Sequence, residues 1–281
     1  SGPQNPGPVL AAVQEHLPRS GPSANYHLGP AGGKLTPPHY AYLKVSEGCN
    51  HTCSFCIIPN MRGKLRSRPI DDVLAEADGL AATGVQELLV IAQDTSAYGV
   101  DLRYEKRRYQ DRMLKSDLET LCVELGARFP WLRLHYVYPY PHVDRLLPLM
   151  ADGVVLPYLD VPLQHADPRI LKAMRRPAAV ENTLERLRVW REICPEITVR
   201  STFIVGFPGE TNIEYEGTLE VMNKVIFDRA FMFKYSSRPG TKAAEYSDQI
   251  DEVIKQKRLT RLIDLQQTHT LKANQRHIGR V

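Results

Sequence analysis

The fold class of this chain is decided by residues 46–56, which read Ser46-Glu47-Gly48-Cys49-Asn50-His51-Thr52-Cys53-Ser54-Phe55-Cys56. This run places three thiols, those of Cys49, Cys53 and Cys56, within eight residues. An iron–sulfur cubane usually takes four cysteines, so a loop that offers three leaves one iron open to a small molecule that can chelate it and react. The loop therefore indicates a reaction centre rather than an electron carrier.

Two other uses of these thiols stay open. Zinc could take them together with His51, although that ring lies between two of the thiols and structural zinc sites usually pair knuckles well apart in sequence. Disulfides fit less well, because 5 cysteines are a low and odd number for 281 residues and no apolar signal peptide opens the chain. The cysteine usage predicts a reducing, cytoplasmic location.

The composition is that of a globular protein with a large core. Of the 281 residues, 43% are hydrophobic and 24% are charged, which suits one large domain or two ordinary ones. No apolar run approaches the ~20 residues that cross a bilayer, so we expect no membrane role. The net charge of +4 is carried by residues 251–281, which hold seven Lys or Arg against three Asp or Glu.

Proline and glycine set the first 38 residues apart from the rest. Eight prolines and six glycines in this segment oppose a continuous helix or a central strand. We interpret residues 1–38 as a Pro/Gly-rich linker, residues 39–250 as a barrel domain and residues 251–281 as a basic C-terminal helix. The apolar face of that helix is predicted to consist of Val253, Leu259, Leu262, Ile263 and Leu271.

From Tyr40 onward, short apolar runs alternate with helical patterns, which is typical of βα units around a parallel sheet. The six candidate strands are residues 41–45, 87–91, 133–137, 158–161, 198–204 and 229–233. Helical spacing follows at residues 70–81, 118–125, 146–150 and 184–189. Six units fall short of the eight that close a TIM barrel. We therefore predict an α/β fold, an open (β/α)6 partial TIM barrel with a C-terminal helical extension and with its reactive residues after the strand C-termini.

The cysteine loop directly follows the first predicted strand. A Cys-x3-Cys-x2-Cys loop in this position, with Phe55 before the last cysteine, resembles the radical S-adenosylmethionine (SAM) superfamily. The resemblance implies a [4Fe-4S] cluster held by Cys49, Cys53 and Cys56, with SAM on the fourth iron. Reduction of that cluster would cleave SAM to methionine and a 5′-deoxyadenosyl radical.

Further motifs over residues 34–211 resemble the radical SAM methylthiotransferase family. They include RSRP at 66–69, QDTSAYG at 93–99, PLQH at 162–165 and GFPGET at 206–211. The match favours the branch that methylthiolates an aspartate side chain of ribosomal small-subunit protein twelve. The run FMFKYSSRPGT at 231–241 is more similar to the MiaB type, which modifies a tRNA adenosine, so a tRNA substrate stays open. A non-catalytic RNA- or ribosome-binding module that keeps its cluster for stability is a third hypothesis.

The resemblance implies SAM contacts at eight residues. These are Phe55 beside the adenine, Gln93, Asp94 and Thr95 at the methionine amine, Gln164, Arg200 and Thr202 at the ribose and carboxylate, and Lys234 at the adenine pocket. Physical chemistry allows other uses: Phe55 could be a core residue, and Asp94 or Thr95 a helix N-cap. An arginine inside a parallel sheet needs an anion, which for Arg200 is either the cofactor carboxylate or an internal acid. No catalytic residue is assigned beyond the cluster ligands.

Members of the family carry two parts that we do not expect in this chain. They are an N-terminal methylthiotransferase domain with a second [4Fe-4S] cluster and a C-terminal TRAM domain, a small RNA-binding β-barrel. Cys122 and Cys194 are expected to be buried apolar residues that cannot replace the second cluster's ligands. The chain is therefore expected to bind one cluster and to cleave SAM with an external electron donor, but to be incomplete for sulfur insertion. Basic runs at 62–68 and 103–115 are candidates for docking RNA phosphates, or simply solvated faces.

Overall fold

The structure is a computed structural model, and it describes residues 8, 11–12, 15, 36–176 and 183–279. The predicted linker at 1–38 lies almost entirely outside these residues. Within the described ranges, no helix combines the length and the apolar character needed to cross a bilayer.

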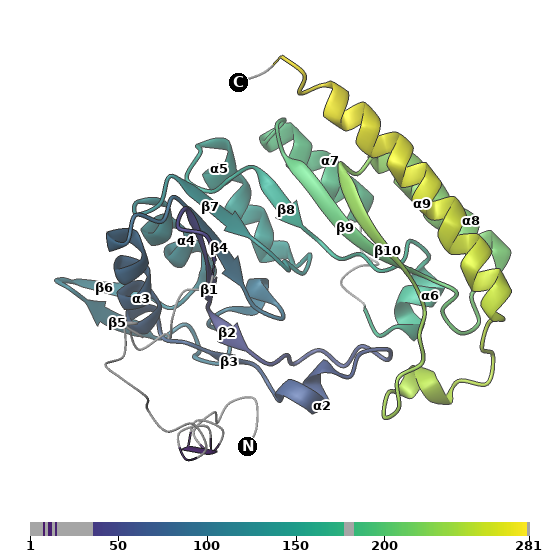
Figure 1. Ribbon diagram of the computed structural model, residues 1–281, viewed down its shortest axis with the longest axis horizontal. Coiled ribbons are helices and arrows are strands. Elements are labelled where there is room, and N and C mark those ends of the chain that lie inside the picture. The colour runs from purple at the N-terminus through teal and green to yellow at the C-terminus, as the bar shows by residue number, and fades with distance from the viewer. Residues whose placement is uncertain (1–7, 9–10, 13–14, 16–35, 177–182, 280–281) are drawn as a thin grey trace.

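Six parallel strands form the wall of an open barrel (Figure 1). In spatial order they are β1 (Tyr40–Lys44), β4 (Glu87–Ile91), β7 (Trp131–Leu134), β8 (Tyr158–Asp160), β9 (Thr198–Val205) and β10 (Arg229–Lys234). The first three strands form one sheet and the last three another. Two backbone hydrogen bonds join the sheets, from Leu156 N to Leu132 O (2.8 Å) and from Val137 N to Asp160 O (2.9 Å). The strands therefore follow one another in chain order, which confirms the predicted (β/α)6 arrangement.

Helices follow the strands and cover the outside of the wall. They are α3 (Ile70–Ala82), α4 (Leu118–Gly126), α5 (Leu146–Ala151), α6 (Pro168–Ala173), α7 (Thr183–Ile193), α8 (Asn212–Val225) and α9 (Glu252–Gln275). Local capping explains where several begin. The Asp117 side chain accepts a hydrogen bond from Thr120 N at the start of α4, and Thr211 and Glu214 form a capping box at the start of α8. The four predicted helical segments are all confirmed.

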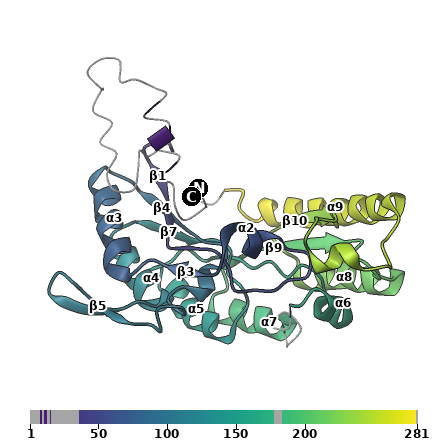
Figure 2. The ribbon, with the colours of Figure 1, turned by 90° about the horizontal axis from the view of Figure 1, so that it is seen from below.

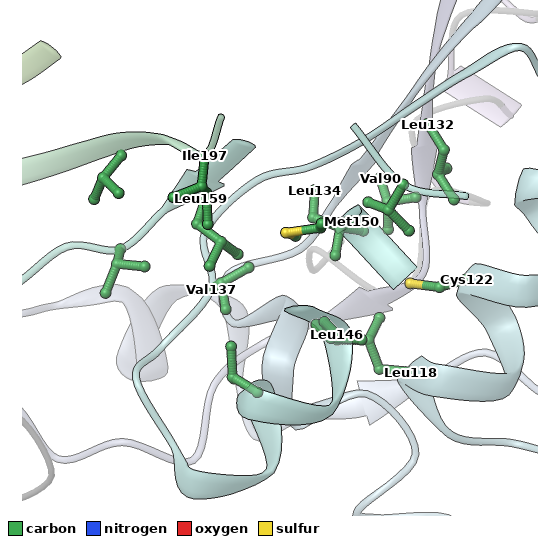
Figure 3. Packing of buried hydrophobic residues seen from close by; sticks show 14 of the residues in the cluster. Val90, Leu118, Cys122, Leu132, Leu134, Val137, Leu146, Met150, Leu159 and Ile197 are labelled. Carbon is green, nitrogen blue, oxygen red and sulfur yellow. The ribbon is translucent and has the colours of Figure 1, made fainter. Parts of the chain in front are cut away.

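The main core lies between the strands and the outer helices. Figure 3 shows Val90 and Leu134 of the strands beside Cys122 of α4 and Met150 of α5. Cys122 is fully buried and Cys194 nearly so, as predicted for small apolar residues. Residues alternate in burial along β9, so that one face packs into this core and the other is left for the barrel interior.

Two short antiparallel pairs were not predicted. They are β2 (Ser46–Glu47) with β3 (Arg66–Ser67), and β5 (Lys106–Tyr109) with β6 (Arg112–Lys115). The second pair contains most of the basic run at 103–115, whose charged and largely exposed side chains lack the alternation that marks a strand. Several of its cations have acidic partners, such as Glu105 for Arg107 (2.8 Å). Docking of RNA on this run stays a prediction.

Helix α9 packs along α8 and β10 through a mixed face (Figures 1 and 2), in which Leu262 and Leu259 of the predicted apolar face meet the core beside buried polar side chains. Val253 and Leu271 are 60% and 61% exposed, so the predicted face is wrong at both ends. The residues that α9 buries are Lys255, Arg258, Leu262, Gln266, His269 and Ala273. Polar side chains are needed here because the opposing surface presents acceptors: Gln266 Nε2 donates to Phe227 O (2.8 Å).

A buried carboxylate connects α9 to the turn after β9. The Glu210 side chain is fully enclosed and accepts hydrogen bonds from Arg258 Nη1 (2.6 Å) and Gly206 N (2.5 Å). It also pairs with His165 Nε2 (2.9 Å). The Tyr215 hydroxyl of α8 donates to Arg258 O (2.9 Å), so α8, α9 and the turn after β9 share one network. His165 is therefore held by the fold and does not line the site described below.

We predict that Arg258→Met lowers the free energy of unfolding by about 3–5 kcal/mol, because Glu210 stays buried without its guanidinium partner. The matched control is Arg261→Met, which removes an exposed ion pair with Glu216 between the same two helices and should change stability little. Denaturant unfolding of both variants measures the difference. Equal losses would contradict a structural role for the buried network.

Candidate active site

The backbone shapes the start of the three-cysteine loop. Gly48 has a φ of 77°, and a Cβ added there would collide with the carbonyl oxygen of Lys64. Cys49 N donates to Gly63 O (3.1 Å), at the end of α2 (Ile58–Arg62). Glycine at position 48 therefore lets β2 turn into the loop while the chain beyond α2 passes close behind it.

The middle of the loop is tied to the opposite side of the barrel. Ser54 is 1% exposed, and its backbone N–H donates to Met174 O (3.1 Å). Its hydroxyl donates to Ala173 O (2.8 Å), and its carbonyl accepts from Ala243 N (2.9 Å) in the turn η4 (Lys242–Glu245). A loop that begins after the first strand thus reaches the elements after the fourth and sixth strands and spans the mouth of the barrel.

A cavity of about 640 Å³ lies between this loop and the carboxyl ends of the strands. Its volume suits a small-molecule or cofactor site, for which 300–1,000 Å³ is a rough range. Its wall contains the three cysteines and six of the eight predicted contact residues. These six are Phe55, Gln93, Asp94, Gln164, Arg200 and Thr202. The fold therefore brings together residues of the loops after β1, β4 and β8 with residues inside β9.

Thr95 and Lys234, the other two predicted contacts, lie elsewhere. Thr95 is buried, and its hydroxyl donates to His135 O (2.6 Å), so it joins the segments after β4 and β7. Lys234 pairs with Glu252 and reaches Gln256 Oε1 (3.3 Å) on α9. Neither side chain is part of the cavity wall.

Several polar atoms in the wall are buried without a protein partner. Among the described residues, Oε1 of Gln93 and of Gln164 accept no hydrogen bond, and Nε of Arg176 and of Arg200 donate none. Buried polar groups are normally paired, so these carbonyl acceptors and N–H donors are suited to a polar ligand. A cavity that combines them with three thiols fits an iron–sulfur cluster together with a ligand that carries both an ammonium and a carboxylate.

Gln164 holds an unusual backbone conformation in this wall, with a φ of 75°. Its N–H donates to Thr202 O (2.7 Å) and its carbonyl accepts from Ile204 N (2.7 Å), which makes a short parallel bridge to β9. A residue with a side chain pays about 1–2 kcal/mol for the left-handed region. The two bonds to β9 hold it there, and such strain is often found at ligand sites.

Arg200 has an internal acid, one of the two anions predicted for it. Its Nε lies 3.6 Å from Asp160 Oδ1, which is close enough for an ion pair but too long for a hydrogen bond. Its Nη1 donates to the Tyr158 hydroxyl (3.2 Å), and its guanidinium stacks 4.2 Å from the centre of the Phe231 ring. Arg200 and Thr202 share the inward face of β9, as alternation predicted.

Sequence reasoning missed a cluster of aromatic and charged side chains beside the cysteines. His51 Nε2 lies 2.8 Å from Asp94 Oδ2, and the His51 ring stacks on Tyr138 with 4.3 Å between centroids. Asp94 also accepts a hydrogen bond from Ser96 (2.5 Å). The signal in the sequence was the aromatic run at 135–140, at the end of the third strand, but its contact with His51 depends on the fold.

The thiols themselves are half-buried. Burial raises the pKa of Cys49 to about 11 and raises the pKa of Cys56 as well, so both must lose a proton to bind iron. No three His, Cys, Asp or Glu side chains in the described ranges converge on one metal ion. A cubane requires no such convergence, because each thiolate binds a different iron. His51, which was considered as a zinc ligand, instead pairs with Asp94.

Comparison with known proteins gives one matching family model and relatives that are more than half identical to the chain. The family model described as the radical SAM superfamily matches residues 43–222. A ribosomal protein uS12 methylthiotransferase RimO from Methylobacillus flagellatus is 53% identical over 281 residues, which are 100% of this chain and 64% of that protein. The protein of the same name from Xanthomonas campestris is 57% identical over 264 residues, 94% of this chain and 58% of that protein. The chain thus spans less than two thirds of the length of these relatives.

A solved structure supports the fold. The radical SAM methyltransferase TsrM from Kitasatospora setae matches with a TM-score of 0.56 and 17% identity, over 74% of this chain and 38% of that chain. At this identity the match concerns the fold alone. It agrees with the six-unit open barrel described above.

We predict that, at position 164, a glycine variant is more stable than an alanine variant, which is the reverse of the usual order. Glycine normally destabilises by about 0.5–1 kcal/mol relative to alanine, but at a positive φ alanine retains the strain and glycine does not. Gln164→Gly should therefore be about 0.5–1 kcal/mol more stable to denaturant than Gln164→Ala. The same pair of substitutions at the exposed Gln249 is the control, and there the alanine variant should be at least as stable as the glycine variant. A more stable alanine variant at position 164 would refute the strain.

Proposed function

Since the chain belongs to the radical SAM superfamily, we propose that it forms the radical-generating part of a ribosomal protein uS12 methylthiotransferase. The proposed reaction of the whole protein installs a methylthio group on an aspartate side chain. The observation that carries the proposal is the three-cysteine loop facing a cavity with buried, unpartnered polar atoms. The substrate is inferred from relatives of that name, which are 53% and 57% identical to the chain.

Members of this superfamily use a [4Fe-4S] cluster and SAM. In this chain, Cys49, Cys53 and Cys56 would each bind one iron as thiolates and leave the fourth iron toward the cavity. When bound, the cluster and SAM supply a 5′-deoxyadenosyl radical that can abstract a hydrogen atom from an unactivated carbon. The side chains around them have to bind and orient the cofactor and exclude water.

Side chains of the cavity wall support a proposed placement of the ammonium group, the ribose and the adenine of SAM. The Gln93 carbonyl and the Asp94 carboxylate suit the ammonium group, because an acceptor facing a cation forms a charge-assisted hydrogen bond. Ser96 and His51 already engage both oxygens of Asp94, so the carboxylate is held in place before the ligand binds. Gln164 and Thr202, on the facing wall, are proposed to bind the ribose.

Phe55 is proposed to stack on the adenine, a contact worth about 0.5–1.5 kcal/mol. The residue lines the cavity and also packs against a small core cluster that includes Phe207 and Tyr235. The core contact holds the ring in the cavity wall, which supports the proposed stacking. Stacking on a ring that is already ordered costs little conformational entropy on binding.

The chain is proposed to hold one cluster. Cys122 and Cys194 are buried in or beside separate helices, where they serve the core. Sulfur insertion by the whole protein would therefore depend on ligands other than these five cysteines. We further propose a cytoplasmic location, because the thiols must stay reduced, and an external one-electron donor for the cluster.

We predict about four irons per chain after anaerobic reconstitution, and 5′-deoxyadenosine when SAM and a strong reductant are added. Alanine at Cys49, Cys53 or Cys56 should abolish both, because each removes a corner ligand. Cys194→Ala is the control and should keep its iron. About eight irons per chain would contradict the single cluster. An intact cluster that yields no 5′-deoxyadenosine would instead favour a non-catalytic module.

The substrate is tested with the full-length gene. Mass spectrometry of ribosomal protein uS12 and of tRNA nucleosides should be compared between cells with and without that gene. We expect the methylthio group to disappear from the aspartate of uS12 while tRNA is unchanged. Loss of a methylthio-adenosine with unchanged uS12 would overturn the assignment and favour the tRNA branch.

A further inference from the structure

Arg176 is a buried cation without an acidic partner among the residues that the structure describes. It lies in the cavity wall just after α6 and is 5% exposed. The other buried lysine and arginine in the described ranges do have carboxylates, Glu252 for Lys255 and Glu210 for Arg258. Burying an unpaired charge is costly, so a buried guanidinium without an acid indicates an anion that binds beside it.

The contacts of Arg176 direct its charge toward the cysteine loop. Its Nη1 donates to Cys53 Sγ (3.7 Å) and its Nη2 donates to Pro162 O (2.5 Å). Its guanidinium carbon lies 4.4 Å from the centre of the Tyr138 ring, a cation–π contact. The proline carbonyl and the aromatic ring hold the plane of the guanidinium, and one edge of it faces the sulfur.

The anion that fits this position is the cluster. Three thiolates outweigh the charge of an oxidised [4Fe-4S] core, and reduction by an external one-electron donor adds one further negative charge. A fixed cation that donates a hydrogen bond to a ligand sulfur stabilises the reduced form more than the oxidised form. No bond to Arg176 forms or breaks in this role.

We propose that Arg176 is a positioning residue that supplies the counter-charge of the cluster through the Cys53 sulfur and raises the cluster's reduction potential. The inference rests on the proposed cluster site and adds to it the residue that tunes the electron transfer. The competing use of Arg176 is to bind the carboxylate of SAM. The two differ in one measurable respect, because a counter-charge acts on the cluster even when SAM is absent.

The test is an anaerobic redox titration of the reconstituted chain without SAM, followed by electron paramagnetic resonance. It compares the wild type with R176Q and R176M, which remove the charge, and with R176K, which retains it. At the wild-type midpoint potential, the ratio of reduced to oxidised cluster should fall about tenfold in R176Q and R176M. This corresponds to about 59 mV for a one-electron couple. R176K should lie closer to the wild type.

Arg175→Gln is the matched control. Arg175 is exposed and adjacent, so this variant removes the same charge without a contact to the loop, and its ratio should be unchanged. Two charge-removing variants are used so that misfolding of one does not decide the result. If R176Q and R176M both hold about four irons and keep the wild-type ratio of reduced to oxidised cluster, the inference is wrong. Weaker SAM binding by these two variants would then assign Arg176 to the cofactor carboxylate. Absence of iron from the wild type would overturn the cluster site itself and the inference with it.

Discussion

The site depends on the hydrogen bonds by which Ser54 ties the cysteine loop to the far side of the barrel. The two sheets of the barrel meet only between β7 and β8 in the described chain, so the side between β1 and β10 is open. Ser54 donates to Ala173 O and Met174 O and accepts from Ala243 N, which joins the loop after β1 to elements after β8 and β10. The loop thereby spans the mouth that strand pairing leaves open, and its thiols share a cavity with residues in or after the other five strands.

This closure explains why the inner wall carries buried polar side chains among its apolar ones, whereas the outer core is apolar. In a closed eight-stranded barrel the interior is filled with packed apolar side chains. Here an open interior of six strands keeps a cavity, and its wall carries Arg176, Arg200 and Gln164. Apolar burial is moved to the outer face of the strands, under the helices. The polar interior is stable only where each group finds a partner, either in the protein or in the ligand that the cavity takes.

The sequence predicted the features that depend on local pattern. Apolar alternation along β9 placed Arg200 and Thr202 on one face, and the cysteine spacing with its preceding strand located the site. Features that depend on distant contacts were missed. Arg176 is 123 residues from Cys53, and nothing near it in the chain distinguishes it from the exposed Arg175. The polar part of the α9 face was missed for the same reason, because the acceptors that it covers belong to other elements, whereas Leu262 was placed correctly.

The two arginines of the cavity wall differ in how their charges are balanced. Arg200 has Asp160 beside it, so its charge has a counter-charge within the protein, although its Nε makes no hydrogen bond. Arg176 has a sulfur, a carbonyl oxygen and a ring, none of which is a carboxylate. A bound anionic cluster beside Cys53 would supply the missing negative charge. The free energy that it costs to bury Arg176 without an acid therefore favours binding of an anionic cluster at the mouth of the barrel.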